Sequence, residues 1–234
     1  MHLVHVTESD EPVGGLETFI RSYTRWWTAA GHTVTLLTPP FPTTPPVAAD
    51  LVLAHIGRPL GALYGLYLAQ VLGVPAVALL HGHTDYVRDL VRYLRPRHAV
   101  ALSRRTHQVF PESTCILKGV DTDLFAPRPQ VVVDHDFIFL ARRAACKHWE
   151  RLPADRTGIL CVSDCPHAET PAHYARCRAL LDYAVDYEPH SYVELEAAAM
   201  GVHAPCGLTR DDILRDYTLS VQAARLVQYL ESVR

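Results

Sequence analysis

The chain has 234 residues, of which 49% are hydrophobic and 20% charged, and its formal net charge at pH 7 is −3. This length and apolar content suffice for one sizeable core or two small ones, and the slightly acidic balance argues against wholesale coating of nucleic acid. No apolar run approaches the roughly 20 residues of a membrane span, and no signal peptide is visible, so a soluble protein is expected.

Strand-like and helix-like segments alternate through the first half, which is the pattern of a parallel sheet with crossover helices. Between the first two strands, residues 16–30 carry apolar side chains at helical spacing, and Gly31 is the expected stop signal. The strands predicted in this half are His2 to Val6, Thr33 to Thr38, Leu51 to Ile56, Pro75 to Leu80, His98 to Leu102 and Cys115 to Leu117.

A proline-bearing stretch at residues 125–130 predicts a linker that divides the chain into domains 1–128 and 129–234. The second series alternates again, so two Rossmann-like α/β domains facing across a cleft are the economical architecture. Its predicted strands are Phe137 to Leu140, Gly158 to Val162, Tyr183 to Asp186 and Val202 to Cys206, and its predicted helices are Pro171 to Leu181, Tyr192 to Met200 and Thr218 to Val233.

Residues suited to ligand binding follow several of these strands. Gly14 and Gly15 lie between the first strand and the first helix, where glycine lets backbone approach a ligand and the helix start favours an anion. His81 and His83 follow the fourth strand, where imidazoles can bind a metal, act as acid or base, or bind a sugar or phosphate. Each feature also has a purely structural interpretation, as an ordinary turn or a satisfied histidine.

Charged residues mark the second half. Arg142 and Lys147 follow its first strand, and together they would neutralise a diphosphate leaving group. Glu188 would lie at the end of a strand and Glu196 on the helix that begins near Ser191, at the edge where open α/β sheets bind ligands. Solvated surface charges are the alternative for all four.

The six cysteines follow no regular framework spacing, which indicates reduced thiols and a cytoplasmic location. A zinc cluster of Cys161, Cys165, His167 and Cys177 is disfavoured, because these residues match no standard ligand spacing. No zinc site is therefore predicted at these four residues.

Positive charge concentrates between His83 and His107, where six arginines face two acids. Such a stretch is more often solvated surface than a binding site, but it suits the phosphates of DNA or of an anionic lipid surface. The candidate contacts are Arg88, Arg92, Arg104 and Arg105.

Taken together, the motifs resemble the family 4 glycosyltransferases, retaining enzymes of GT-B architecture that use nucleotide-diphosphate sugars. Each motif alone is weak, and the resemblance rests on their order and their placement on the expected elements. The matching stretches are Gly14-Gly15-Leu-Glu17, Gly31-His-Thr-Val-Thr35, His81-Gly82, Gly119 to Phe125 followed by Pro127, Arg142 with Lys147, and Glu188 to Glu196 with Gly201.

The resemblance implies a metal-independent hexosyl- or pentosyltransferase that needs no cofactor and takes a nucleotide sugar, such as a UDP-sugar, as donor. In such an enzyme Arg142 and Lys147 would hold the diphosphate, and Glu196 would hold the ribose hydroxyls. Glu188 would bind the donor sugar, and His81 would contact that sugar or place the acceptor hydroxyl. The implied substrate-binding set is completed by Gly14, Gly15, Ser191, Tyr192 and Val193.

The chain departs from the family pattern in the residues after Glu188 and in its length. Pro189, His190 and Ser191 replace the usual glycines after Glu188, which narrows the approach to the donor. The chain is also far shorter than typical relatives, and about one strand-helix unit is expected to be missing between Val162 and Tyr183.

Compactness together with the arginine-rich stretch favours a phage-type enzyme whose acceptor is a hydroxymethylated base in DNA. A lipid or cell-envelope glycan is the alternative acceptor. A degenerate family member that binds a nucleotide without catalysis is a second alternative. A nicotinamide-dependent oxidoreductase ranks last, because the first turn lacks the Gly-x-Gly-x-x-Gly pattern.

Overall fold

The computed structural model describes residues 1–8, 15–42, 48–56, 59–82, 84–141, 148–182 and 191–234. The chain forms two compact units, each built on a parallel β-sheet with helices, which confirms the predicted α/β class. The first unit comprises Met1–Glu11, Phe19–Lys118 and Gln222–Arg234, and the second comprises Pro12–Thr18 and Gly119–Val221.

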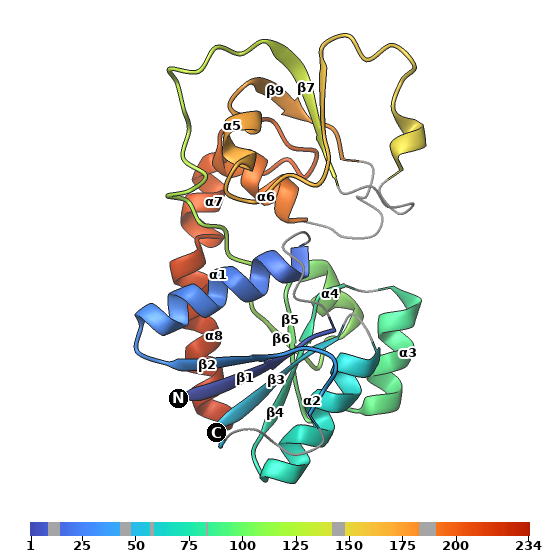
Figure 1. The fold of residues 1–234 in the computed structure, drawn as a ribbon, viewed down its shortest axis with the longest axis vertical. Helices are drawn as coiled ribbons and strands as arrows, with labels where there is room; N and C mark the ends of the chain where they lie inside the picture. Colours follow the sequence, from blue (N-terminus) through green and yellow to red (C-terminus); the bar gives the residue numbers. More distant parts are fainter. Residues whose placement is uncertain (9–14, 43–47, 57–58, 83, 142–147, 183–190) are drawn as a thin grey trace. The chain divides into compact units, whose positions relative to one another are not determined.

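The first unit contains a six-stranded, all-parallel sheet in the order β2-β1-β3-β4-β5-β6 (Figure 1). All six strands predicted in this half are found, with small shifts at their ends. They are β1 (His2–Val6), β2 (Thr33–Leu37), β3 (Leu51–Ile56), β4 (Ala76–Leu80), β5 (His98–Ala101) and β6 (Thr114–Cys115).

Helices cover both faces of this sheet (Figure 1). Side chains alternate along a strand, so neighbouring residues of β3 face opposite helices. His55 contacts Phe19 of α1, whereas Ala54 lies beside Gly65 of α2. The helices of this unit are the part of α1 (Gly15–Ala29) from Phe19 onward, α2 (Pro59–Leu72), α3 (Asp85–Leu94), α4 (Arg104–Val109) and the part of α8 (Leu219–Val233) from Gln222 onward.

Helix α1 confirms its predicted pattern. Phe19, Ile20, Tyr23 and Trp27, which recur at helical spacing, are all buried. The helix ends at Ala29, and Gly31 adopts a φ of 86°, the left-handed conformation that glycine favours after a helix. The predicted stop signal therefore ends α1 as expected.

The second unit contains a three-stranded parallel sheet in the order β8-β7-β9. The predicted strands Phe137 to Leu140 and Gly158 to Val162 are found as β7 and β8, and the predicted helix beginning at Tyr192 is found as α6. Its elements are β7 (His135–Leu140), the short 3-10 helix η2 (Trp149–Arg151), β8 (Ile159–Val162), α5 (Thr170–Tyr174), β9 (Cys177–Leu180), α6 (Tyr192–Ala199), α7 (Arg210–Asp216) and the start of α8.

The helix predicted over Pro171 to Leu181 is wrong. Helix α5 ends at Tyr174, and the following residues form β9, which pairs with β7. A short apolar run has no decisive periodicity, and here the free edge of β7 supplies its backbone partners. Between Val162 and Tyr183 the structure places α5 and β9. The expected lack of one strand-helix unit relative to longer family members stays a prediction.

Two further strand predictions have different outcomes. In the predicted strand Val202 to Cys206 only His203 pairs, through a single bridge to Ala179. The predicted strand Tyr183 to Asp186 lies outside the described residues.

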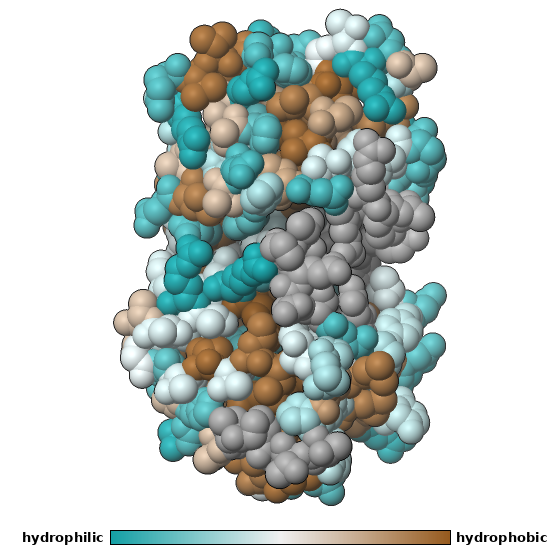
Figure 2. Space-filling view, in the orientation of Figure 1, coloured by the Kyte–Doolittle hydropathy of each residue, from teal (hydrophilic) through white to brown (hydrophobic). Residues whose placement is uncertain are grey.

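Polar side chains dominate the surface drawn in Figure 2, and apolar patches interrupt them. The exposed large apolar side chains include Leu60, Leu63, Tyr67 and Val71, all on α2. In the part of the chain that the structure describes, no helix combines the length and apolar character needed to cross a membrane.

Candidate functional site

The carboxyl edge of the first sheet carries polar residues directly after its strands. Because all six strands are parallel, their carboxyl ends meet at this edge. Glu8 follows β1 and accepts a hydrogen bond from the backbone N–H of Gly61 at 2.9 Å. His81 follows β4, and Ser103 follows β5 and caps α4. The edge thus has the polar character expected of a ligand-binding site.

His81 is the outer member of a row of three histidines. Its Nε2 lies 2.8 Å from Nδ1 of His55 on β3, and Nε2 of His55 lies 2.8 Å from Nδ1 of His5 on β1. Sequence reasoning selected only His81. The available signal was a histidine within each of two apolar strands, but only the strand register aligns the three side chains.

Burial controls the charge of the inner two histidines. Desolvation lowers the pKa of His5 to about 3. Desolvation, followed by the charges of His81 and His5, lowers the pKa of His55 well below its usual value. Both rings are therefore neutral near pH 7, and each offers one N–H donor and one acceptor nitrogen.

In the second unit, Ser191 caps the start of α6 in a capping box. Its hydroxyl accepts from the N–H of Glu194, whose carboxylate accepts in turn from the N–H of Ser191. The same hydroxyl donates to Asp182 at 2.9 Å. The predicted binding residues Tyr192 and Val193 form the first turn that this box fixes in place.

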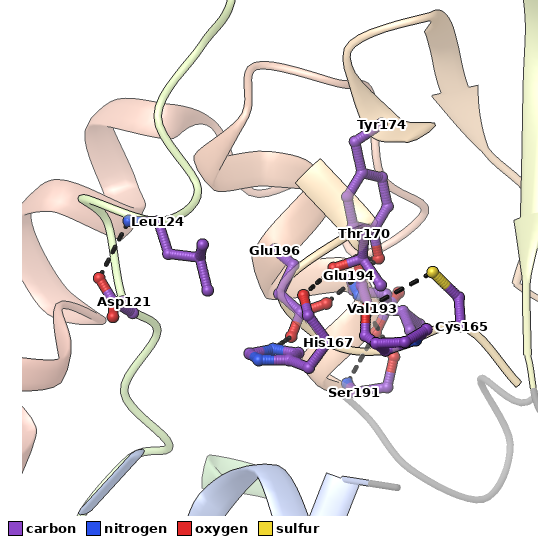
Figure 3. A network of polar contacts seen from close by, with 11 residues as sticks. Asp121, Leu124, Cys165, His167, Thr170, Tyr174, Ser191, Val193, Glu194 and Glu196 are labelled. Carbon is purple, nitrogen blue, oxygen red and sulfur yellow. Dashed lines mark hydrogen bonds and ion pairs between the residues drawn. The ribbon is translucent and has the colours of Figure 1, made fainter. Parts of the chain in front are cut away.

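Glu196 projects from α6 into a buried polar network (Figure 3). Its Oε1 accepts from Nε2 of His167 at 2.7 Å, and its Oε2 accepts from the Tyr174 hydroxyl at 3.3 Å. The Glu196 side chain is only 3% exposed. Burial, and then the Glu196 carboxylate, raises the pKa of Tyr174 well above its usual value, so the phenol keeps its proton and remains a donor.

Sequence reasoning missed Tyr174 and considered His167 only as a zinc ligand. Neither residue carried a signal for contact with Glu196, because His167 lies 29 positions away and Tyr174 22 positions away in the chain. The ring of Phe125 lies 5.2 Å from that of His167. The stretch before Phe125 turns around Asp121, whose Oδ1 accepts from the N–H of Leu124 at 3.0 Å (Figure 3). The stretch from Asp121 to Phe125 therefore borders the polar network around Glu196.

The residues considered for zinc are held by other contacts. The Cys177 thiol donates to the carbonyl oxygen of His173 at 3.4 Å, and burial raises the pKa of that thiol to about 11. His167 is bound to Glu196. Among the described residues, no three His, Cys, Asp or Glu side chains are grouped so that they could hold a metal ion.

Of the remaining predicted site residues in the glycine, histidine and charged motifs, the acceptor arginines aside, the structure describes only Gly15. Gly15 is the first residue of α1. Gly14, Arg142, Lys147 and Glu188 lie outside the described residues, as does His83. Their predicted roles stay predictions.

The predicted acceptor arginines fall into two pairs. Arg88 and Arg92 on α3 form ion pairs within their own helix, with Asp85 at 3.1 Å and Asp89 at 3.8 Å. Arg104 and Arg105 begin α4 and are exposed. Among the described residues, no ion pair involves Arg104 or Arg105.

Sequence comparison matches no known family model and no curated protein. Comparison of folds does give matches. HepE of Anabaena, solved in complex with UDP and glucose, superposes with a TM-score of 0.70 over 99% of this chain and 100% of its own, at 14% sequence identity. The superposition therefore extends over nearly the whole of both chains.

An alpha-glucosyltransferase solved with UDP-glucose and DNA containing an abasic site matches with a TM-score of 0.55 at 10% identity, over 86% of this chain and 78% of its own. The same kind of enzyme, solved with UDP and a 13-mer DNA containing an HMU base, matches with a TM-score of 0.55 at 11% identity, over 87% and 78%. At such low identity these likenesses establish the fold. The chain therefore has the α/β fold of these glycosyltransferase structures.

Proposed function

We propose that this protein is a retaining GT-B glycosyltransferase that transfers a sugar from a UDP-sugar to an acceptor hydroxyl. The observation that carries the proposal is the end-to-end fold match with HepE, which was solved with UDP and glucose. The positions of His81 and Glu196 support it, since each lies where an α/β unit of this kind would meet a ligand. The family 4 motif order adds independent support from the sequence.

In the proposed reaction, the acceptor oxygen bonds to the anomeric carbon on the face from which UDP departs. The bond between that carbon and the β-phosphate oxygen breaks, and the departing phosphate takes the proton of the acceptor hydroxyl. Arg142 and Lys147 stabilise the charge that develops on the diphosphate. These two cations take the role of a metal ion, so neither metal nor cofactor is required.

Glu196 is proposed to bind the ribose of the nucleotide. An ionised carboxylate has about four acceptor positions, and His167 and Tyr174 each use one. The remaining positions can accept hydrogen bonds from the ribose hydroxyls, while the two partners hold the carboxylate still. Glu188 is proposed to bind the hydroxyls of the donor sugar. The N-terminal domain would then bind the acceptor and the C-terminal domain the nucleotide sugar.

The proposed acceptor is a hydroxymethylated base in DNA. A matched alpha-glucosyltransferase was solved with DNA containing an HMU base, and Arg104 and Arg105 offer exposed positive charge on the predicted acceptor-binding half. If the acceptor is instead a lipid or cell-envelope glycan, we expect the protein to have no measurable affinity for duplex DNA.

The donor is tested by a screen of nucleotide sugars for thermal stabilisation, followed by an assay of UDP release. A ligand that binds only the folded protein stabilises it by mass action and so raises its melting temperature. At a ligand concentration a hundred times Kd, the free energy of unfolding rises by about 2.7 kcal/mol. We expect the UDP-sugars to stabilise the protein and at least one to be consumed. A protein that binds UDP but consumes no UDP-sugar with any acceptor would instead be a degenerate, non-catalytic member.

Lys147→Ala and Glu188→Ala test the assignment of the site. Loss of a charge that stabilises the leaving group or positions the sugar should lower kcat by about a hundredfold or more. Melting temperatures without ligand should match the wild type. Arg215→Ala is the control, because the ion pairs that this exposed arginine forms among the described residues are with its near neighbours Asp212 and Asp216. Full activity in both site variants would overturn the assignment.

The DNA acceptor is tested by the salt dependence of duplex binding. Each phosphate contact contributes about 0.9 to the slope of log K against log salt. Replacing both Arg104 and Arg105 by alanine should therefore reduce the slope by about two. The Arg215→Ala variant should leave the slope unchanged, and absence of DNA binding even at low salt would exclude this acceptor.

A further inference from the structure

The histidine row follows from the strand register. The pairing of β1 with β3 places His5 opposite Leu53, so His55 lies two residues closer to the carboxyl edge. The pairing of β3 with β4 places His55 opposite Leu79, so His81 lies two residues closer still. The three side chains therefore lie in a diagonal row across the sheet, from His5 in the core to His81 at the carboxyl edge, where a ligand would bind.

Aromatic side chains of α1 hold this row in place. The ring of Trp27 stacks on His5, with centroids 5.3 Å apart. Phe19 contacts both other histidines edge to face, with its centroid 5.9 Å from that of His55 and 5.2 Å from that of His81. Enclosed by these rings, His55 has its two ring nitrogens directed at its two neighbours in the row.

The two hydrogen bonds force the rings to share one proton arrangement. In the first arrangement, Nδ1–H of His5 donates to His55, and Nδ1–H of His55 donates to Nε2 of His81. In the second, every donor is an Nε2–H and both bonds run in the opposite direction. A mixed arrangement would set two donors or two acceptors against each other.

The inner end of the row decides between the two arrangements. Nε2 of His5 is buried and has no hydrogen-bond partner among the described residues. The second arrangement would leave an N–H group at this atom without an acceptor, whereas the first leaves only a lone pair. Buried N–H groups without a partner are the rarer and more costly defect. The core therefore favours Nδ1–H at all three rings.

We propose that His55 is a positioning residue that fixes the tautomer of His81, holding Nε2 of His81 as an acceptor so that its Nδ1–H group donates a hydrogen bond to the bound ligand. The identity of that ligand as the sugar of a UDP-sugar rests on the proposed function. The tautomer itself does not, because it is inferred from the two hydrogen bonds of the row and from its buried inner end. His81 would then bind an oxygen atom of the donor sugar as a hydrogen-bond donor of fixed orientation.

The tautomer is measured on the wild-type protein labelled with 15N-histidine. Long-range 1H–15N spectra distinguish a protonated ring nitrogen from an unprotonated one, and spectra of single variants assign the signals. We expect Nδ1–H at His5, His55 and His81 near pH 7.5. Nε2–H at His81, or a rapid exchange between its two tautomers, would overturn the proposal.

Two matched variants separate positioning from simple core packing. His55→Phe keeps a ring beside Phe19 but removes the donor to His81, so His81 should become a mixture of tautomers. His5→Phe makes the same substitution at the inner end of the row. His55 then becomes the buried inner end and should still donate to His81. Equal behaviour of His81 in the two variants would contradict the proposal.

Activity supplies the second measurement. We expect His55→Phe to lower kcat by roughly tenfold or more with little change in KM, and His55→Asn to recover part of the loss because its amide can donate near the position of Nδ1. His5→Phe should keep most of the activity. If no UDP-sugar is consumed by the wild type, the proposed function fails while the spectra still decide the tautomer. If the enzyme is active and His81 carries Nε2–H, only the present proposal fails.

Discussion

The buried histidines couple the stability of the first unit to pH. The folded protein keeps His5 and His55 neutral because desolvation lowers the pKa of each. In the unfolded chain both have a pKa near 6.5, so below that pH the unfolded state binds protons that the folded state does not. Stability is therefore complete above pH 6.5 and falls with decreasing pH, for His5 until the pH nears its folded pKa of about 3.

We expect each histidine to contribute a loss of about 2 kcal/mol in the free energy of unfolding between pH 7.5 and pH 5. Urea unfolding at the two pH values measures the loss. His5→Phe retains a ring against Trp27. Between pH 7.5 and pH 5 its free energy of unfolding should fall by about 2 kcal/mol less than that of the wild type. Carboxylates titrate alike in both proteins, so an unchanged pH sensitivity would mean that His5 is not neutral in the fold.

At the scale of elements, α2 packs unusually close to the sheet. A Cβ atom on Gly65 would lie 2.9 Å from Cβ of Ala54 on the central strand β3 and 3.4 Å from Cβ of Val6 on β1. Neither neighbour has a flexible end that can move away. The absence of a side chain at residue 65 therefore sets the distance between the helix and the sheet.

Gly65→Val should destabilise the protein by about 3 kcal/mol, because the added atoms overpack a rigid contact. Valine introduced at the exposed Gln70 of the same helix is the control, and its effect should stay within about 0.5 kcal/mol. Chemical denaturation measures both. If the two variants proved equally stable, α2 would have to adjust its distance from β3 freely.

At the scale of the whole molecule, the end of the chain completes the first unit. Gln222 accepts a hydrogen bond from the N–H of Leu117 at 3.1 Å, and the Trp27 indole donates to the carbonyl oxygen of Ala223 at 3.5 Å. Leu226 and Leu230 are fully buried. A unit that begins with residue 1 thus takes its last helix from the opposite end of the sequence.

Deletion of residues 222–234 should therefore destabilise the first unit by about 5 kcal/mol or more, since several buried side chains are lost together. Amides of β1 and β3 should lose protection against hydrogen exchange. Deletion of residues 232–234 alone is the control, because it removes no fully buried side chain. Unchanged protection in the longer deletion would show that α8 adds little to this core.

Much of this fold could be predicted locally. The six strands of the first sheet, the buried stripe of α1 and the glycine that ends it all follow from periodicity and turn chemistry. The error at Pro171 to Leu181 has the opposite origin. Five helical residues followed by a four-residue strand carry too short a pattern, and β7 determines the outcome by supplying hydrogen bonds.

The sequence by itself determined the α/β class, the order of the strands in the first unit and the placement of His81 and Glu196 on their elements, because these depend on neighbours within a few positions. Only the tertiary structure decided what these two residues touch. His81 meets His55 through the register of β3 and β4, and Glu196 meets His167 and Tyr174 through the packing of α6 against α5 and its preceding loop. Those contacts join residues 22 to 29 positions apart, and no local pattern encodes them.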